Sequence, residues 1–179
     1  MWITVLNSAD CSRYELHQKL WGLFPQHQAG KSDRPFCYKD TGETVYVLSN
    51  TETSESVSVD IEQGERYMFT VTASARRGTY RDESGKRVRL NPYTTASELK
   101  QWLARRLAGC AELGLIDVTV LPPRTVTKPN GNKMVFPKTE FKGVLTITDV
   151  DEFKRVASVG IGQGCAFGLG AILLIGDAL

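Results

Sequence analysis

The alternation of apolar and polar residues predicts short strands interrupted by three helices. Strands are expected where apolar residues alternate or form short runs between turn residues, at 2–7, 34–39, 44–50, 66–75, 115–121, 141–148 and 168–175. Helices are expected at 13–24, 95–110 and 151–158. Alternation at Val57, Val59 and Ile61 favours a strand or extended segment over 51–62 rather than a helix.

Residues at the ends of these segments sharpen the predicted boundaries. Ser12 is a suitable N-cap for the first helix, and Pro25 ends it. Pro122-Pro123 is expected to stop the strand 115–121, because proline cannot donate to the hydrogen-bond ladder of a sheet. The helix 95–110 presents one apolar face, made of Leu99, Trp102, Leu103, Leu107 and Cys110.

The order of the segments predicts an α+β protein. Helices recur between pairs of strands, which indicates two βαβ-like halves and fits two tandem ferredoxin-like (RRM-like) domains. The polar, basic connection 76–90 separates them, so the predicted domains are 1–80 and 81–179. The first domain lacks a second helix where 51–62 lies, and it is therefore expected to be abbreviated.

Charge is distributed unevenly along a chain that is nearly neutral as a whole. The formal net charge is +2, which does not by itself indicate a nucleic-acid partner. Residues 76–89 hold six basic residues against two acidic ones, and 124–142 hold five against one, whereas 51–65 hold five acidic residues and no basic one. Such asymmetry can create a basic face, although each run taken alone is also explained as solvated surface.

Cysteine and histidine usage gives no sign of a metal or cofactor site. The chain has two histidines, and its four cysteines lie far apart in sequence, so no zinc-ligand spacing exists and no cofactor is expected. No signal peptide opens the chain, and the longest apolar run, 171–175, is too short to span a membrane. These observations predict a cytoplasmic protein with free thiols and no membrane partner.

The segment 160–170 contains five glycines, which would disrupt a helix or a packed strand. Backbone without side chains commonly approaches a phosphate through its N–H groups. The alternative is a tight connection between strands that packs against the other domain.

Two motifs at opposite ends of the chain carry a specific resemblance. The glycine-rich loop between a short helix and a last apolar strand resembles the C-terminal loop of CRISPR repeat-RNA endoribonucleases of the CasE type, in the RAMP superfamily. Residues 14–25, YELHQKLWGLFP, resemble the first helix of that family, which carries the catalytic histidine. The resemblance is strong over 13–25 and 141–174 and follows general pattern in between.

The resemblance implies that His17 is the catalytic residue and that Tyr14 helps to order the scissile nucleotide. Tyr14, His17 and Trp21 share one flank of the first helix, where a side chain can reach a ligand. From the residues alone, a histidine between a tyrosine and a tryptophan is more often a packed surface-edge residue, and Tyr14 is also explained as a contributor to helix packing. Lys19 and Lys31 are nearby charges that could stabilise the phosphate, and the sequence does not assign this role to either.

The chemistry that the resemblance implies is metal-free RNA cleavage. The ribose 2′-OH attacks the adjacent phosphate and the 5′-oxygen leaves, which produces 2′,3′-cyclic phosphate and 5′-hydroxyl ends. An imidazole suits the proton transfer near neutral pH, and donors or cations must stabilise the phosphate oxygens. The lack of clustered carboxylates argues against a two-metal nuclease.

The expected RNA contacts come from the glycine loop and from the basic segments. The family often has a lysine where this chain has Cys165, which removes a phosphate contact. Asn130-Gly131 predicts a hairpin turn, and its basic arms resemble the hairpin with which the family contacts the repeat stem-loop. The predicted RNA-binding residues are Gly160, Gly162, Gly164, Arg76, Arg77, Arg87, Arg89, Lys128 and Lys133.

The leading hypothesis is an endoribonuclease that cleaves CRISPR precursor RNA at the base of the repeat stem-loop and stays bound to the guide RNA. The partners expected from the resemblance are that stem-loop and the other subunits of a type I-E Cascade complex, without an obligate homo-oligomer. A second hypothesis is a structural subunit that holds the hairpin without cleaving it. A third is a ferredoxin-like interaction protein that binds no RNA.

Overall fold

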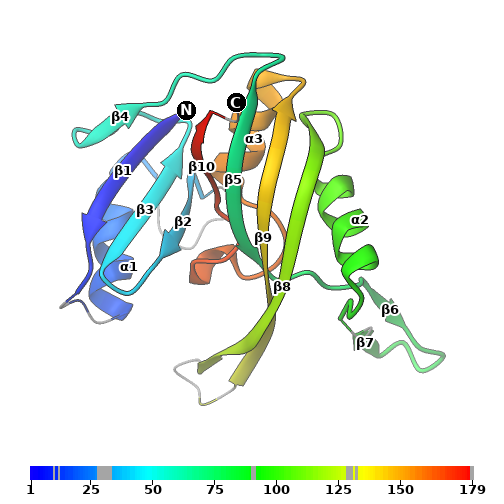
Figure 1. Ribbon diagram of the computed structural model, residues 1–179. Coiled ribbons are helices and arrows are strands. Elements are labelled where there is room, and N and C mark those ends of the chain that lie inside the picture. The colour runs from blue at the N-terminus through cyan, green and yellow to red at the C-terminus, as the bar shows by residue number, and fades with distance from the viewer. Residues whose placement is uncertain are drawn as a thin grey trace.

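The computed structural model describes residues 1–9, 11, 13–27, 34–89, 92–127, 131 and 133–177. Within them, two four-stranded antiparallel sheets form the framework (Figure 1). The first sheet has the order β2-β3-β1-β4, with β1 Trp2–Asn7, β2 Phe36–Asp40, β3 Thr44–Ser49 and β4 Ser56–Ser58. The second has the order β10-β5-β9-β8, with β5 Arg66–Ala73, β8 Ala111–Thr127, β9 Lys133–Ile147 and β10 Ile172–Asp177. A small hairpin joins β6 Thr79–Arg81 to β7 Arg87–Arg89.

Three α-helices and one short 3₁₀ helix accompany the sheets: α1 Arg13–Gly22, α2 Ala96–Leu107, α3 Val150–Val159 and η1 Cys165–Phe167. Each predicted helix is present, and the predicted apolar face of α2 is buried. Thr95 and Glu98 form a reciprocal capping box at the start of α2. In the described residues before β5, α1 is the only helix, as the abbreviated first half predicted.

Two hydrophobic clusters hold α1 and α3 against the sheets. Leu16 and Leu20 of α1 pack with Phe36, Val45 and Val47 of the first sheet. The larger cluster lies under the second sheet and also takes in residues of β2 and β3. Helix α3 contacts both of these strands, so it joins the first sheet to the second (Figure 1).

Strand β5 belongs to the second sheet, although the predicted boundary at residue 80 places it in the first domain. It lies between β9 and β10, with Arg66 opposite Thr146 and Ala73 opposite Thr139 on β9. The chain therefore changes sheets between β4 and β5. Local pattern identifies a strand but not its partner, because pairing depends on residues more than sixty positions away.

The predicted stop at Pro122-Pro123 was wrong, because β8 continues through both prolines to Thr127. The pairing of β8 with β9 is irregular between Leu121 and Arg124, where the prolines lie. Strand β8 is also at the edge of its sheet. An edge strand with a bulge tolerates proline, since the missing N–H falls where the ladder is already interrupted.

The described part of the chain has no helix that is both long and apolar enough to cross a membrane.

Gly143 in β9 lies opposite a second irregularity of β8, between Leu113 and Ile116. A Cβ at this position would overlap the carbonyl oxygen of Leu115 and lie 2.9 Å from the Cα of Ile116. We expect Gly143→Ala to lower the free energy of unfolding by about 2 kcal/mol, because the backbone of β8 at Leu115 and Ile116 must shift away from the added methyl group. This corresponds to a fall in Tm of roughly 4–8 °C.

The measurement is thermal unfolding followed by circular dichroism. Gly78→Ala is the matched control, since an added Cβ there meets nothing within 4 Å. Equal Tm values for the two variants would contradict the steric interpretation of Gly143.

Candidate functional site

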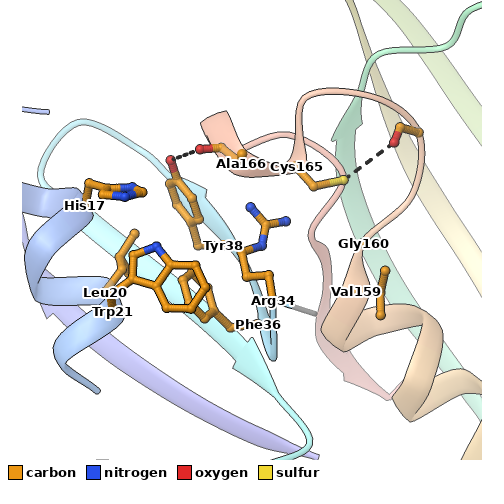
Figure 2. Close-up of a pocket in the computed structure, with 11 residues that line it drawn as sticks. His17, Leu20, Trp21, Arg34, Phe36, Tyr38, Val159, Gly160, Cys165 and Ala166 are labelled. Carbon is orange, nitrogen blue, oxygen red and sulfur yellow. Dashed lines mark hydrogen bonds between the residues drawn. The ribbon is translucent and has the colours of Figure 1, made fainter. Parts of the chain in front are cut away.

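A cavity of about 480 Å³ lies where the first helix, the first sheet and the glycine-rich loop meet. Its walls combine residues from both ends of the chain (Figure 2). They are His17, Leu20 and Trp21 from α1, Arg34, Phe36 and Tyr38 from β2 and the residues before it, and Val159, Gly160, Gly162, Cys165 and Ala166 from the end of α3 and its loop. The two motifs that carry the resemblance therefore form one site.

His17 lies on an exposed face of α1, at the edge of this cavity. The neighbouring Leu16 and Leu20 are buried and anchor the helix on the first sheet. The His17 ring meets the edge of Trp21, with 6.3 Å between the centroids, and Trp21 in turn packs against Phe36 at 5.4 Å. The imidazole is thus held beside the cavity by aromatic contact and remains open to solvent.

Tyr38 connects the first sheet to the loop. Its hydroxyl donates a hydrogen bond to the carbonyl oxygen of Ala166, over 3.1 Å (Figure 2). Burial raises the pKa of the Tyr38 phenol, while the positive charges of Arg124 and Arg34 oppose that shift. The sequence analysis placed Tyr38 only within a strand, since nothing in its local pattern indicates a contact 128 residues away.

The glycines of the loop adopt positive φ and pack closely. Gly160, Gly162 and Gly164 have φ of 81°, 80° and 83°. A Cβ on Gly162 would lie 3.0 Å from the carbonyl oxygen of Ser74 and 3.1 Å from the Trp102 ring. The N–H of Gly160 already donates to the carbonyl of Val156. The loop therefore has the features of a tight packed connection, and phosphate contact by these glycines stays a prediction.

Cys37 and Cys165 lie together beneath the loop, both as free thiols. A Cβ on Gly160 would overlap the Cys37 sulfur and lie 3.1 Å from the Cys165 sulfur. A hydrogen bond from the Cys37 thiol lowers the pKa of Cys165 to about 7, with help from the Arg34 charge and against the effect of burial. The same hydrogen bond, together with burial, raises the pKa of Cys37 well above its ordinary value.

Arg76 and Arg77 are not among the residues that line this cavity. Arg76 donates to the carbonyl of Val135 in β9, with its guanidinium over the Phe136 ring. Arg77 pairs with Glu98 at the start of α2. Both arginines therefore brace the second domain as well as carrying charge.

The structure describes the other predicted residues only in part. Lys133 is exposed at the beginning of β9, and Lys19 reaches the sulfur of Cys11 at 3.0 Å. Arg87 and Arg89 lie on β7 and Tyr14 on α1, but their side chains fall outside the described part. Ser12, Lys31, Lys128 and Asn130 lie outside the described residues altogether.

Metal ligands are not gathered anywhere in the described ranges. No group of three or more His, Cys, Asp or Glu side chains in them could hold a metal ion. The groups that can do chemistry in the cavity are the imidazole of His17, the guanidinium of Arg34, the phenol of Tyr38 and the thiol of Cys165.

The Cys37–Cys165 pair leads to a measurable pH dependence. In a Cys11→Ser background, we expect alkylation of Cys165 by iodoacetamide to increase with a midpoint near pH 7, because the thiolate is the reacting form. Cys37→Ala should move that midpoint upward, since it removes the largest stabilising hydrogen bond. Mass spectrometry of the modified peptide gives the rate.

Cys110 provides an internal control in the same samples. Burial raises its pKa to about 11, so it should remain unmodified over this pH range. An unchanged midpoint in Cys37→Ala would show that the thiol pair does not set the pKa of Cys165.

Three solved structures share this fold over nearly the whole chain. Cas6e from Escherichia coli str. K-12 is 25% identical, with a TM-score of 0.70 and coverage of 97% of this chain and 98% of that one. The CRISPR endoribonuclease Cse3 bound to 19 nt RNA is 24% identical, with a TM-score of 0.70 and coverage of 97% and 99%. A chain of a CRISPR RNA-guided surveillance complex is 21% identical, with a TM-score of 0.67 and coverage of 97% and 98%.

The match to Cas6e confirms the predicted α+β class with two ferredoxin-like domains. No curated protein matches the chain significantly. The sequence profile of the family described as "CRISPR associated protein" matches residues 7–175, which is nearly the full length. The chain therefore belongs to this family of CRISPR-associated proteins.

Proposed function

We propose that this protein is a metal-independent endoribonuclease that cleaves CRISPR precursor RNA at the base of the repeat stem-loop. The observation that carries the proposal is the position of His17 at a cavity that is also lined by the glycine-rich loop from the other end of the chain. The shared fold with Cas6e, and with a Cse3 endoribonuclease bound to RNA, supports the same assignment.

The cavity suits one nucleotide and its phosphate. Its volume of about 480 Å³ lies in the range of small-molecule sites, and its walls are largely apolar and aromatic. The ribose 2′-OH loses its proton and attacks the adjacent phosphorus, and the 5′-oxygen leaves with a proton. The products are a 2′,3′-cyclic phosphate and a 5′-hydroxyl, and the His17 imidazole performs one of the two proton transfers.

The long hairpin of β8 and β9 is the proposed surface for the stem of the RNA. It extends beyond the other strands of its sheet (Figure 1). Lys133 is exposed on this hairpin. Arg124 lies on the same hairpin and next to the loop, since a Cβ placed on Gly168 would lie 3.4 Å from a guanidinium nitrogen of Arg124. Contacts from such basic side chains to the RNA phosphate backbone would position an A-form stem by its shape rather than by its sequence.

The proposed partners are the repeat stem-loop and the other subunits of a Cascade complex, to which the protein stays bound after cleavage. The similar chain within a CRISPR RNA-guided surveillance complex supports this assembly. Free thiols suit a reducing cytoplasm.

A second candidate is a subunit that holds the hairpin without cutting it. The observation that favours it is that no hydrogen bond from another described side chain orients the His17 ring, which makes its ring contact with Trp21.

Substitution of His17 distinguishes the two candidate functions. We expect His17→Ala to lower the single-turnover cleavage rate by about 10²–10⁴-fold, because one proton transfer loses its catalyst. RNA affinity should change little, since the side chain is exposed at the cavity edge. The chain's other histidine offers a matched control, and His27→Ala should cleave at the original rate. Cleavage by His17→Ala at that rate would exclude the proposed role.

The chemistry itself is tested without mutation. We expect the purified protein to cut a repeat stem-loop once in excess EDTA, and a 2′-deoxy substitution at the cut site to abolish the cut because the nucleophile is missing. The products are read by gel and by phosphatase sensitivity of the new ends. Tight binding without cutting would support the second candidate, and cleavage of the deoxy substrate would exclude attack by the 2′-oxygen.

A further inference from the structure

We propose that Arg34 is the residue that binds and neutralises the scissile phosphate in this cavity. This inference rests on the proposed function, because it concerns the phosphate that His17 would act beside. It concerns a residue that no sequence motif singled out. Among the described side chains that line the cavity, Arg34 supplies the only guanidinium or ammonium group.

Arg34 makes an aromatic contact with Phe36 and a side-chain hydrogen bond with Cys165. Its guanidinium carbon lies 5.4 Å from the centroid of the Phe36 ring, two residues further along the chain. Phe36 is itself fixed, because it is buried and stacks on Phe24 with centroids 5.0 Å apart. The fixed ring therefore supports the guanidinium of a side chain that lines the cavity.

The hydrogen-bonding capacity of Arg34 is incompletely used by the protein. Its Nε is buried, yet it has no hydrogen-bond partner among the described residues. A buried donor without a partner costs free energy, and more so in a charged group. An anion in the cavity would satisfy that donor, and the fork of an arginine matches two oxygens of a phosphate.

The charge of Arg34 acts on groups from two walls of the cavity. It lowers the pKa of Cys165 on the loop and opposes the rise in the pKa of Tyr38 on β2. In the close-up the guanidinium lies between the Tyr38 ring and Cys165 (Figure 2), and His17 lines the same cavity. The described residues that line the cavity include no Asp or Glu, so none of them places a carboxylate beside this charge.

These features favour binding of the phosphate in the transition state over binding of the phosphate in the uncleaved RNA. The attacked phosphorus gains negative charge on its oxygens in the transition state, and a preorganised cation in a partly buried site stabilises that charge most. A loss of Arg34 should therefore reduce the cleavage rate far more than the affinity for RNA. A role confined to packing on Phe36 would change neither the rate nor the affinity.

The test compares Arg34→Gln with Arg34→Lys in single-turnover cleavage of a repeat stem-loop. Arg34→Gln keeps the stem of the side chain and removes the charge, and we expect a rate lower by about 10²–10³-fold. Affinity for the uncleavable 2′-deoxy stem-loop should fall less than tenfold. Arg34→Lys should recover part of the rate. Arg155→Ala is the control, because Arg155 pairs with Glu152 on α3 and does not line the cavity.

A second variant moves the charge across the cavity. In Arg34→Gln combined with Cys165→Lys, the cation comes from the loop wall, and we expect at least a tenfold gain in rate over Arg34→Gln alone. This gain also identifies a loss of charge rather than a loss of fold, since it requires no repair of the Phe36 contact. Thermal unfolding of each variant measures folding directly.

The outcomes distinguish this inference from the proposed function. Cleavage by Arg34→Gln at the original rate would overturn the role of Arg34 and leave the endoribonuclease intact. No cleavage by the unmodified protein would overturn the proposed function, and Arg34 would then be judged by affinity for the deoxy stem-loop. Equal affinities of the unmodified protein and Arg34→Gln in that case would overturn the phosphate contact as well.

Discussion

The close approach of Gly160 to Cys37 is the contact on which the rest of the site depends. It joins the end of α3 to strand β2, and a Cβ on Gly160 would overlap the Cys37 sulfur. Because α3 packs on β2 and β3, the glycine loop that follows it must run along the first sheet. The cavity, the Tyr38 hydrogen bond to Ala166 and the thiol pair all follow from this placement.

The site is an assembly of groups that the chain supplies from two distant regions. Helix α1 contributes the imidazole and β2 contributes the phenol, while the loop contributes backbone and a thiol. Each group alone is ordinary on a protein surface. Their shared position in a partly enclosed space strengthens electrostatic interactions among them, because less water screens the charges. The hydrogen bond from Cys37, with the charge of Arg34, accordingly lowers the pKa of Cys165.

Most elements of the fold follow from local pattern. The helices appear where apolar residues recur at helical spacing, and the hairpins appear where turn residues separate alternating runs. The two larger differences both concern sheets. Strand β5 joins the second sheet, and β8 continues through Pro122 and Pro123 at an edge. In each case the deciding interaction is pairing with β9, which is distant in sequence from β5 and joined to β8 by a hairpin.

The sequence by itself determined the α+β class, the positions of the helices, the candidate role of His17 and the unusual glycine content of the loop. Only the tertiary structure decided which residues share the cavity with His17. Arg34 and Tyr38 carry no local pattern that marks them, since a basic residue before a strand and a tyrosine within one are common anywhere on a protein. Their place in the site comes from the packing of α3 across two sheets, and such packing depends on contacts between residues more than one hundred positions apart.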